Sequence, residues 1–276
     1  MTQGLNYRDF LWAAAMVALV AAGALVWWWR DRPMPLDHLA DVAAIAEKFE
    51  DVVFQSDLGK DFKGLYKWEN KIALLVKDKI PHSLRVTLKT TSLSLATYSG
   101  LKIDLTDSPT QANVFLYFLG RDDFQNIATE FMKDKGGYDP KWTSAAMCYF
   151  LGVPSHWIYR RGLIVVGKSL PERDARSCLL EELYQSLGPG KDSPRLRYSI
   201  SYSRDNLTEL SLNDKLILRA LYDDRLAPGM PRAEAMRVAR RVIAELHAAV
   251  RARGPDALIH PRHAARLAAP GAAPAR

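Results

Sequence analysis

An apolar run near the N-terminus constrains this chain more than any other feature. The run, FLWAAAMVALVAAGALVWWW, occupies residues 10–29 and holds twenty uncharged residues. At about 1.5 Å per residue, a helix of this length crosses the hydrocarbon core of a bilayer, which is about 30 Å thick. The run ends in Trp27, Trp28 and Trp29, and indole rings favour the headgroup layer. The sequence therefore predicts one transmembrane helix within an N-terminal anchor, residues 1–32.

A cleaved signal peptide is the alternative, because residues 22–24, AGA, offer a small-residue cleavage site. Cleavage there would leave the apolar residues 25–29 at the mature N-terminus, so we favour an uncleaved anchor. No cysteine directly follows the run, which excludes a lipoprotein anchor. Arginines flank both ends of the run, so the positive-inside rule leaves the orientation nearly tied. We expect a single-pass protein of the inner membrane with residues 30–276 in the periplasm.

The formal net charge of +7 belongs to the C-terminal end of the chain. Residues 231–276 hold nine arginines and three acidic residues, so the rest of the chain is nearly neutral. Residues 231–254 place apolar side chains at alternating spacings of three and four, with arginines on other faces, which predicts a basic amphipathic helix. We interpret it as a helix packed on its own domain; a partner helix, anionic lipid or nucleic acid are alternatives for its exposed face. Aromatic residues do not interleave the arginines, so we expect no nucleic-acid partner.

The middle of the chain has the pattern of an α/β (α+β) domain with a mixed sheet. A proline-broken linker and an amphipathic helix make up residues 33–64, ahead of this domain. Residues 82–100 combine β-branched content with helical spacing and a terminal glycine, and we favour a helix. Residues 255–276 are rich in Ala, Pro and Arg and predict a disordered tail. Apolar runs predict strands at residues 71–78, 101–106, 112–120 and 157–167.

The chain has two cysteines, Cys148 and Cys178. Neither belongs to a C-x-x-C pair, which disfavours a cysteine-based zinc or redox site. One precedes an expected strand, the other lies on an expected helix, and the chain begins with an export-type segment. We therefore predict a disulfide between them, with two buried, unpaired thiols as the alternative.

The stretch CLLEELYQSLG, residues 178–188, lies on an expected helix and holds the candidate site. Its spacing is that of the H-E-x-x-H motif of zinc peptidases, in which two histidines bind the metal and the glutamate activates water. Here Glu181 and Gln185 occupy the two ligand positions, and Glu182 occupies the position of the glutamate. A surface helix with two exposed acids is the alternative.

The following segment, YSISYSRDNLTELSLNDKLILRALYD at residues 198–223, resembles the region after the zinc helix of metzincin peptidases. Ile200 stands where a methionine underlies the metal in those enzymes, and Ser211 and Asp214 form a capping box for a further helix. The chain is also similar to a family of proteobacterial exported and lipoprotein-like proteins of unknown function, which resemble metzincins but carry a degenerate Glu-Glu-x-x-Gln motif. This resemblance implies a zincin or metzincin-like fold, a twisted mixed sheet packed with helices, over residues 65–230.

The chemistry of a zinc peptidase is not expected to survive in this chain. A third metal ligand would fall at Lys191, beside Asp192. Because a neutral amide is a poor zinc ligand and an ammonium group repels the ion, we expect no metal and no cofactor. Adjacent glutamates project about 100° apart on a helix, which disfavours a glycosidase pair. We expect Gln185 instead to hydrogen-bond the loop at residues 191–202, with Ile200 packed beneath the site.

The sequence thus predicts a membrane-tethered, catalytically inactive metallopeptidase-like domain, a pseudopeptidase, that binds a peptide or an envelope protein. We regard Glu181, Glu182 and Gln185 as relics of catalytic positions. One alternative is a membrane-anchored, peptidase-like hydrolase with an unusual metal or none. Another is a cytoplasm-facing adaptor that uses the basic helix. The candidate binding residues are Glu182, Gln185, Asp192 and Tyr202.

Deleting residues 1–32 is expected to convert a membrane-bound protein into a soluble domain, because the deletion removes the apolar run. Carbonate extraction of membranes checks this prediction. Full-length protein should stay in the membrane pellet, and the truncated protein should be recovered in the soluble fraction. Release of the full-length protein by carbonate would contradict an integral anchor.

Overall fold

The computed structural model describes most of the chain outside its two ends. No helix among the described residues is both long and apolar enough to cross a bilayer. The transmembrane helix predicted at residues 10–29 lies almost entirely outside the described residues and stays a prediction. The chain divides into two units, Met1–Pro35 and Leu36–Arg276. The described residues are 16, 17, 20, 37–56, 61–134, 140–202 and 206–269.

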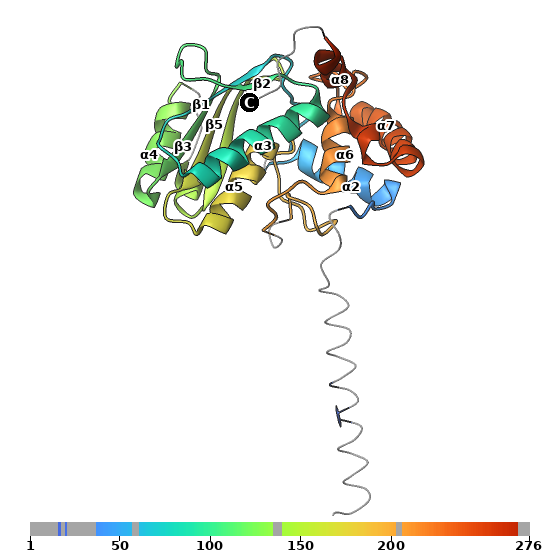
Figure 1. Ribbon diagram of the computed structural model, residues 1–276, viewed down its shortest axis with the longest axis horizontal. Coiled ribbons are helices and arrows are strands. Elements are labelled where there is room, and N and C mark those ends of the chain that lie inside the picture. Colours follow the sequence, from blue (N-terminus) through green and yellow to red (C-terminus); the bar gives the residue numbers. More distant parts are fainter. Residues whose placement is uncertain are drawn as a thin grey trace, which may run out of the picture. The chain divides into compact units, whose positions relative to one another are not determined.

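A five-stranded mixed sheet forms the centre of the Leu36–Arg276 unit (Figure 1). Its strand order is β2-β1-β3-β5-β4, and every neighbouring pair is parallel except β5 and β4. The antiparallel strand β4 therefore lies at one edge of the sheet. The strands are β1 (Ile72–Val76), β2 (Ile103–Leu105), β3 (Val114–Leu119), β4 (Cys148–Ser155) and β5 (Ile158–Gly167).

Helices cover both faces of the sheet, as strands that are apolar on both faces require (Figure 1). On one face, α3 (His82–Ser99) and α5 (Glu172–Gln185) join the side chains of β1, β3 and β5 in the main core. On the other face, α4 (Arg121–Met132) forms a smaller core, in which Phe124 packs with Leu163 of β5. The sheet is thus a central layer between helices.

A second group of helices packs beside the sheet. These are α2 (Val42–Phe54), α6 (Leu212–Leu221) and α7 (Arg232–Arg253), and each contacts the other two. The apolar side of α7 is buried against them, and most of its arginines face solvent. The basic helix therefore packs on its own domain. The predicted segment 33–64, from Leu36 on, and the predicted segment 231–254 belong to the same compact unit as the domain between them.

The predicted α/β class with a mixed sheet is confirmed. The helix expected at 82–100 is also present, and it ends at Gly100, whose φ of 70° is a left-handed conformation that glycine adopts without strain. The capping box of Ser211 and Asp214 begins α6 as expected. The finer expectation of a zincin or metzincin-like fold stays a prediction.

The disordered tail predicted at 255–276 is wrong for the residues up to 269. There a 3-10 helix, η2 (Pro255–Leu258), leads to α8 (Pro261–Ala268). His260 is buried, and its Nε2 atom lies 3.0 Å from the carbonyl oxygen of Tyr222. Composition suggested disorder, whereas this tertiary hydrogen bond and the burial around it hold the segment on the domain. The last seven residues lie outside the described part of the chain.

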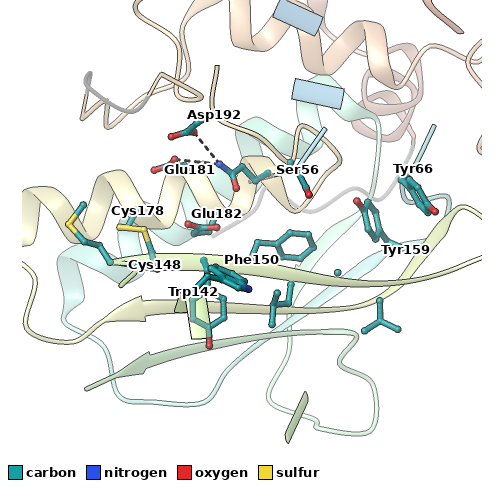
Figure 2. A pocket seen from close by; sticks show the side chains of 18 of the residues that line it. Ser56, Tyr66, Trp142, Cys148, Phe150, Tyr159, Cys178, Glu181, Glu182 and Asp192 are labelled. Carbon is teal, nitrogen blue, oxygen red and sulfur yellow. Dashed lines mark hydrogen bonds between the residues drawn. A yellow bond between two sulfur atoms is a disulfide. The ribbon is translucent and has the colours of Figure 1, made fainter. Parts of the chain in front are cut away.

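The predicted disulfide joins Cys148, at the start of β4, to Cys178 on α5, with their Cα atoms 5.9 Å apart (Figure 2). In the described sheet, β4 pairs on one side only, with β5. The disulfide therefore fastens the edge of the sheet to the helix that packs on it.

Replacing both cysteines with alanine is expected to lower the free energy of unfolding by about 3–4 kcal/mol, because the bond closes a loop of about 30 residues in the unfolded chain. Urea unfolding with and without dithiothreitol measures the change. Reductant should shift the midpoint of the wild type and leave that of the double variant in place. A wild-type midpoint that does not respond to reductant, or two freely alkylated cysteines in protein from native membranes, would contradict the disulfide.

Candidate functional site

A cleft of about 950 Å³ lies between β4 and α5 (Figure 2). One wall is the edge of the sheet with its aromatic side chains, and the other is the helix that carries the degenerate motif. Its polar and charged lining residues are Ser56, Asp61, Asp174, Ser177, Glu181, Glu182, Gln185, Asp192 and Asn206. Its aromatic lining residues are Phe62, Tyr66, Trp142, Tyr149, Phe150 and Tyr159.

The sheet wall of the cleft is the unpaired edge of β4. Consecutive residues 146–154 line the cleft, so it follows the strand along its length. The carbonyl oxygen of Met147 accepts a hydrogen bond from the amide of Gly167, at 3.0 Å. Because backbone groups in an antiparallel pair alternate between the partner and the opposite side, the N–H and C=O groups of Cys148, Phe150 and Gly152 point away from β5. No other described strand pairs with this side of β4.

Side chains on the cleft face of β4 meet a row of aromatic rings. The ring of Phe150 lies edge-on to Tyr159, with centroids 6.0 Å apart, and Tyr159 lies 5.9 Å from Tyr66. Gly152 follows on the same face of β4, where a β-carbon would come within 2.6 Å of the Tyr159 ring. The missing side chain thus lets the ring of Tyr159 approach the strand closely.

The helix wall presents the residues of the degenerate motif. The Nε2 atom of Gln185 donates to Glu181 Oε1 at 3.4 Å and to Asp192 Oδ1 at 3.5 Å, both long hydrogen bonds (Figure 2). The side chains of Glu181 and Asp192 also hydrogen-bond one another. Such a bond needs a proton on one of the two carboxyl groups. The carboxyl groups of Glu181 and Asp192 thus lie close together beside the amide of Gln185.

Burial raises the pKa of Asp192 above its usual range, while the hydrogen bond with Glu181 and the positive charge of Lys48 oppose that rise. The neighbouring Glu182 is 4% exposed and also reaches the cleft. The alternative of a surface helix with exposed acids is therefore wrong, since α5 is buried along most of its length.

The loop that carries Asp192 is held from behind by Lys48 of α2. Lys48 is fully buried, and its Nζ atom donates to the carbonyl oxygens of Ser193 at 3.0 Å and Ser201 at 2.9 Å. Sequence reasoning missed this residue. The spacing of apolar residues could have indicated that Lys48 is buried, because it lies on the apolar face of its helix beside Ile45 and Phe49.

A second buried group fixes the far end of the same loop. The carboxylate of Asp214 accepts hydrogen bonds from Ser199 Oγ at 2.6 Å and from the amide of Ile200 at 3.0 Å. Asp214 is also the N3 residue of the capping box, so it joins the loop to α6. Ile200 is buried in the main core, as expected for a residue that packs beneath the site.

The structure brings most of the predicted site residues together. Glu181, Glu182, Gln185 and Asp192 all line the cleft, and Gln185 makes the expected hydrogen bond to the loop through Asp192. Tyr202 does not line the cleft; its ring lies 5.8 Å from the guanidinium carbon of Arg197 instead. The predicted role of Tyr202 in binding therefore has no support from its position.

Among the described residues, no three His, Cys, Asp or Glu side chains gather in a way that could hold a metal ion. Lys191, at the third ligand position of the motif, hydrogen-bonds Gln55 Oε1. The absence of a bound metal stays a prediction, to be checked by metal analysis of protein purified without chelators or a histidine tag.

Replacing Lys48 with methionine is expected to lower the free energy of unfolding by about 2–3 kcal/mol, because the change leaves two buried carbonyl oxygens without their donor. Urea unfolding followed by circular dichroism measures the loss. The matched control is Lys89→Met on the exposed side of α3, which should change stability by less than about 0.5 kcal/mol. Equal effects of the two substitutions would show that Lys48 does not hold the loop.

The geometry can be set beside known proteins. A search of curated proteins finds no match. The profile of a family described as a protein of unknown function, DUF2927, matches residues 42–241. The match runs from the start of α2 into α7 and so includes Lys48, both walls of the cleft and the loop between them. Because it covers well over half of the 276 residues, the chain belongs to the family of proteins of unknown function DUF2927.

Proposed function

We propose that this protein is a membrane-tethered peptide-binding module of the cell envelope. In this proposal its domain is metallopeptidase-like in fold but catalytically inactive. The observation that carries the proposal is the unpaired edge of β4, which faces a cleft of about 950 Å³ along its length. An extended peptide can add to such an edge as a further strand, with main-chain hydrogen bonds that supply affinity.

The backbone of β4 offers the groups that strand addition needs. The outward N–H and C=O groups belong to every second residue, Cys148, Phe150 and Gly152, and they match the repeat of an extended peptide. Side chains of such a peptide alternate between two directions. Those directed into the cleft would meet the aromatic row of Phe150, Tyr159 and Tyr66 on the sheet wall or the polar groups of α5.

The degenerate motif supports binding rather than hydrolysis. Gln185 donates to two carboxyl groups where a peptidase needs a metal ligand, and Lys48 supports the loop from behind through hydrogen bonds. A placement outside the cytoplasm is supported by the disulfide of Cys148 and Cys178, since such bonds persist in oxidising compartments. Tethering to the inner membrane is supported by the apolar run at residues 10–29.

A hydrolase is the second candidate, and the paired carboxyl groups of Glu181 and Asp192 favour it. Two neighbouring carboxyl groups beside a cleft, one of them with a raised pKa, can serve as general acid and general base. Glu182 would then direct a water molecule or a proton without help from a metal. Mass spectrometry of peptides incubated with the protein separates the candidates. Cleavage that is lost in Glu182→Gln would favour the hydrolase, and intact peptides favour the binding module.

Full-length protein in detergent is expected to bind peptides from a random decapeptide library, and Phe150→Ala is expected to weaken binding about tenfold, the equivalent of about 1.4 kcal/mol of lost contact. The matched control is Val86→Ala, an exposed apolar residue of α3 away from the cleft, which should leave binding unchanged. Thermal unfolding of each variant shows that the fold is retained.

Backbone methylation of a bound peptide tests strand pairing directly. Methyl groups on alternate peptide amides should abolish binding in one register and be tolerated in the other, because only every second amide faces β4. Equal tolerance of both registers would contradict strand addition. Failure of every library peptide to bind would contradict the function itself.

A further inference from the structure

A strip of arginines lies on the exposed side of α7, and none of them lines the cleft. At about 100° per residue, they fall within about a third of the circumference of the helix. Exposed alanines at positions 244 and 248 lie between them on the same side, so no bulky neighbour on the helix covers the guanidinium groups there. We call this side of α7 the arginine face, and its four arginines are Arg237, Arg240, Arg241 and Arg251.

The arginine face keeps an excess of positive charge. The sequence of α7 holds six arginines and two acids, a difference of 6 − 2 = +4. The acids nearby are engaged by arginines outside the face, since Glu50 of α2 pairs with Arg232 at 3.0 Å and Glu245 pairs with Arg225 at 2.7 Å. Among the ion pairs of the described residues, only the one between Arg240 and Glu50, at 3.8 Å, involves a member of the face.

The chain enters its compact unit beside this face. His247 lies four residues before Arg251 and seven after Arg240, so it shares their side of α7. Its Nε2 atom lies 3.1 Å from the carbonyl oxygen of Ala40, just ahead of α2. Ten residues, 30–39, separate Ala40 from the predicted membrane anchor. Such a segment spans at most about 36 Å, so an anchored chain would hold Ala40 within about that distance of the bilayer surface.

We propose that the arginine face of α7 binds anionic lipid headgroups of the bilayer to which the protein is tethered. This inference rests on the tether in the proposed function and is independent of peptide binding. Lipid phosphates accept hydrogen bonds from guanidinium groups and attract their charge. Each basic residue near an anionic surface strengthens association about fivefold, so several acting together hold a tethered domain on the bilayer.

The composition of the arginine face determines the kind of contact. Between its arginines it carries alanines and no large apolar side chain that could enter the acyl layer. The contact is therefore electrostatic and made at the level of the headgroups. Such a contact is reversible and weakens with salt, because mobile ions screen exposed charges. The tether raises the local concentration of lipid, which favours the bilayer over soluble polyanions.

The test uses full-length protein in which Ala248→Cys, on the arginine face, carries an environment-sensitive fluorophore. Cys148 and Cys178 are joined to one another, so only the introduced thiol reacts. The protein is reconstituted into vesicles of phosphatidylcholine alone or with phosphatidylglycerol, and both contain a lipid with a nitroxide on its headgroup. The nitroxide is expected to quench the label at least about threefold more strongly in the anionic vesicles.

Salt and a second label position control this measurement. Salt at about 1 M, where the Debye length is about 3 Å, should remove the excess quenching in anionic vesicles. The same fluorophore on Val86→Cys, an exposed position of α3, should be quenched equally in the two kinds of vesicle.

Arginine substitutions assign the binding to this face. Arg237→Gln, Arg241→Gln and Arg251→Gln should each lower the ratio of docked to free domain about fivefold, because each removes one charge from the headgroup layer. Arg85→Gln, at an exposed arginine of α3, is the matched control and should leave the ratio unchanged. All four side chains are exposed, so the fold should be retained, and thermal unfolding of each variant checks this.

The outcomes separate this inference from the function on which it rests. Full-length protein that floats with neither kind of vesicle would overturn the tether and the inference together. If the protein floats but the label is quenched equally in both vesicles, or if the excess survives the three substitutions combined, the inference is overturned and the tether stands. A label that responds to soluble poly-glutamate or duplex DNA and not to anionic vesicles would also overturn it, in favour of an acidic protein or a nucleic acid.

Discussion

A buried ammonium group holds the loop of the cleft in place. Lys48 lies on α2, more than a hundred residues before the loop, and donates to the carbonyl oxygens of Ser193 and Ser201. A buried lysine is stable only when its charge is offset, and these carbonyl dipoles with the nearby carboxyl groups provide the offset. The loop so held brings Asp192 to Glu181. The position of Asp192 in the cleft therefore depends in part on a charged side chain of a distant helix.

In the proposed peptide-binding function, the two walls of the cleft would contribute different kinds of recognition. The edge of β4 presents backbone groups, which do not distinguish one peptide sequence from another. The wall of α5 presents side chains, which do. The disulfide of Cys148 and Cys178 joins the walls at one end, so their spacing there does not depend on weak contacts. In that proposal, general affinity and selectivity would belong to separate structural elements.

Spacing along the chain was enough to predict much of the site. The motif placed Glu181, Glu182 and Gln185 on one helix, and all three line the cleft. The two cysteines were predicted to pair, and they do. Tyr202 was assigned to the site by its place in a resembling motif, but its position depends on a loop whose path the motif does not determine. The tail at 255–276 was judged by composition, which does not register the tertiary hydrogen bond of His260.

The sequence by itself determined several local features: the helix at 82–100 with its terminal glycine, the capping box that begins α6, the α/β class, and which residues of α5 share a face. These follow from periodicity, capping and turn residues within a few positions of one another. Only the tertiary structure decided that β4 lies at an unpaired edge opposite α5, and that Lys48 is buried under the loop of Asp192. Both depend on contacts between residues far apart in the chain, and strand order and long-range burial leave no short-range pattern in the sequence.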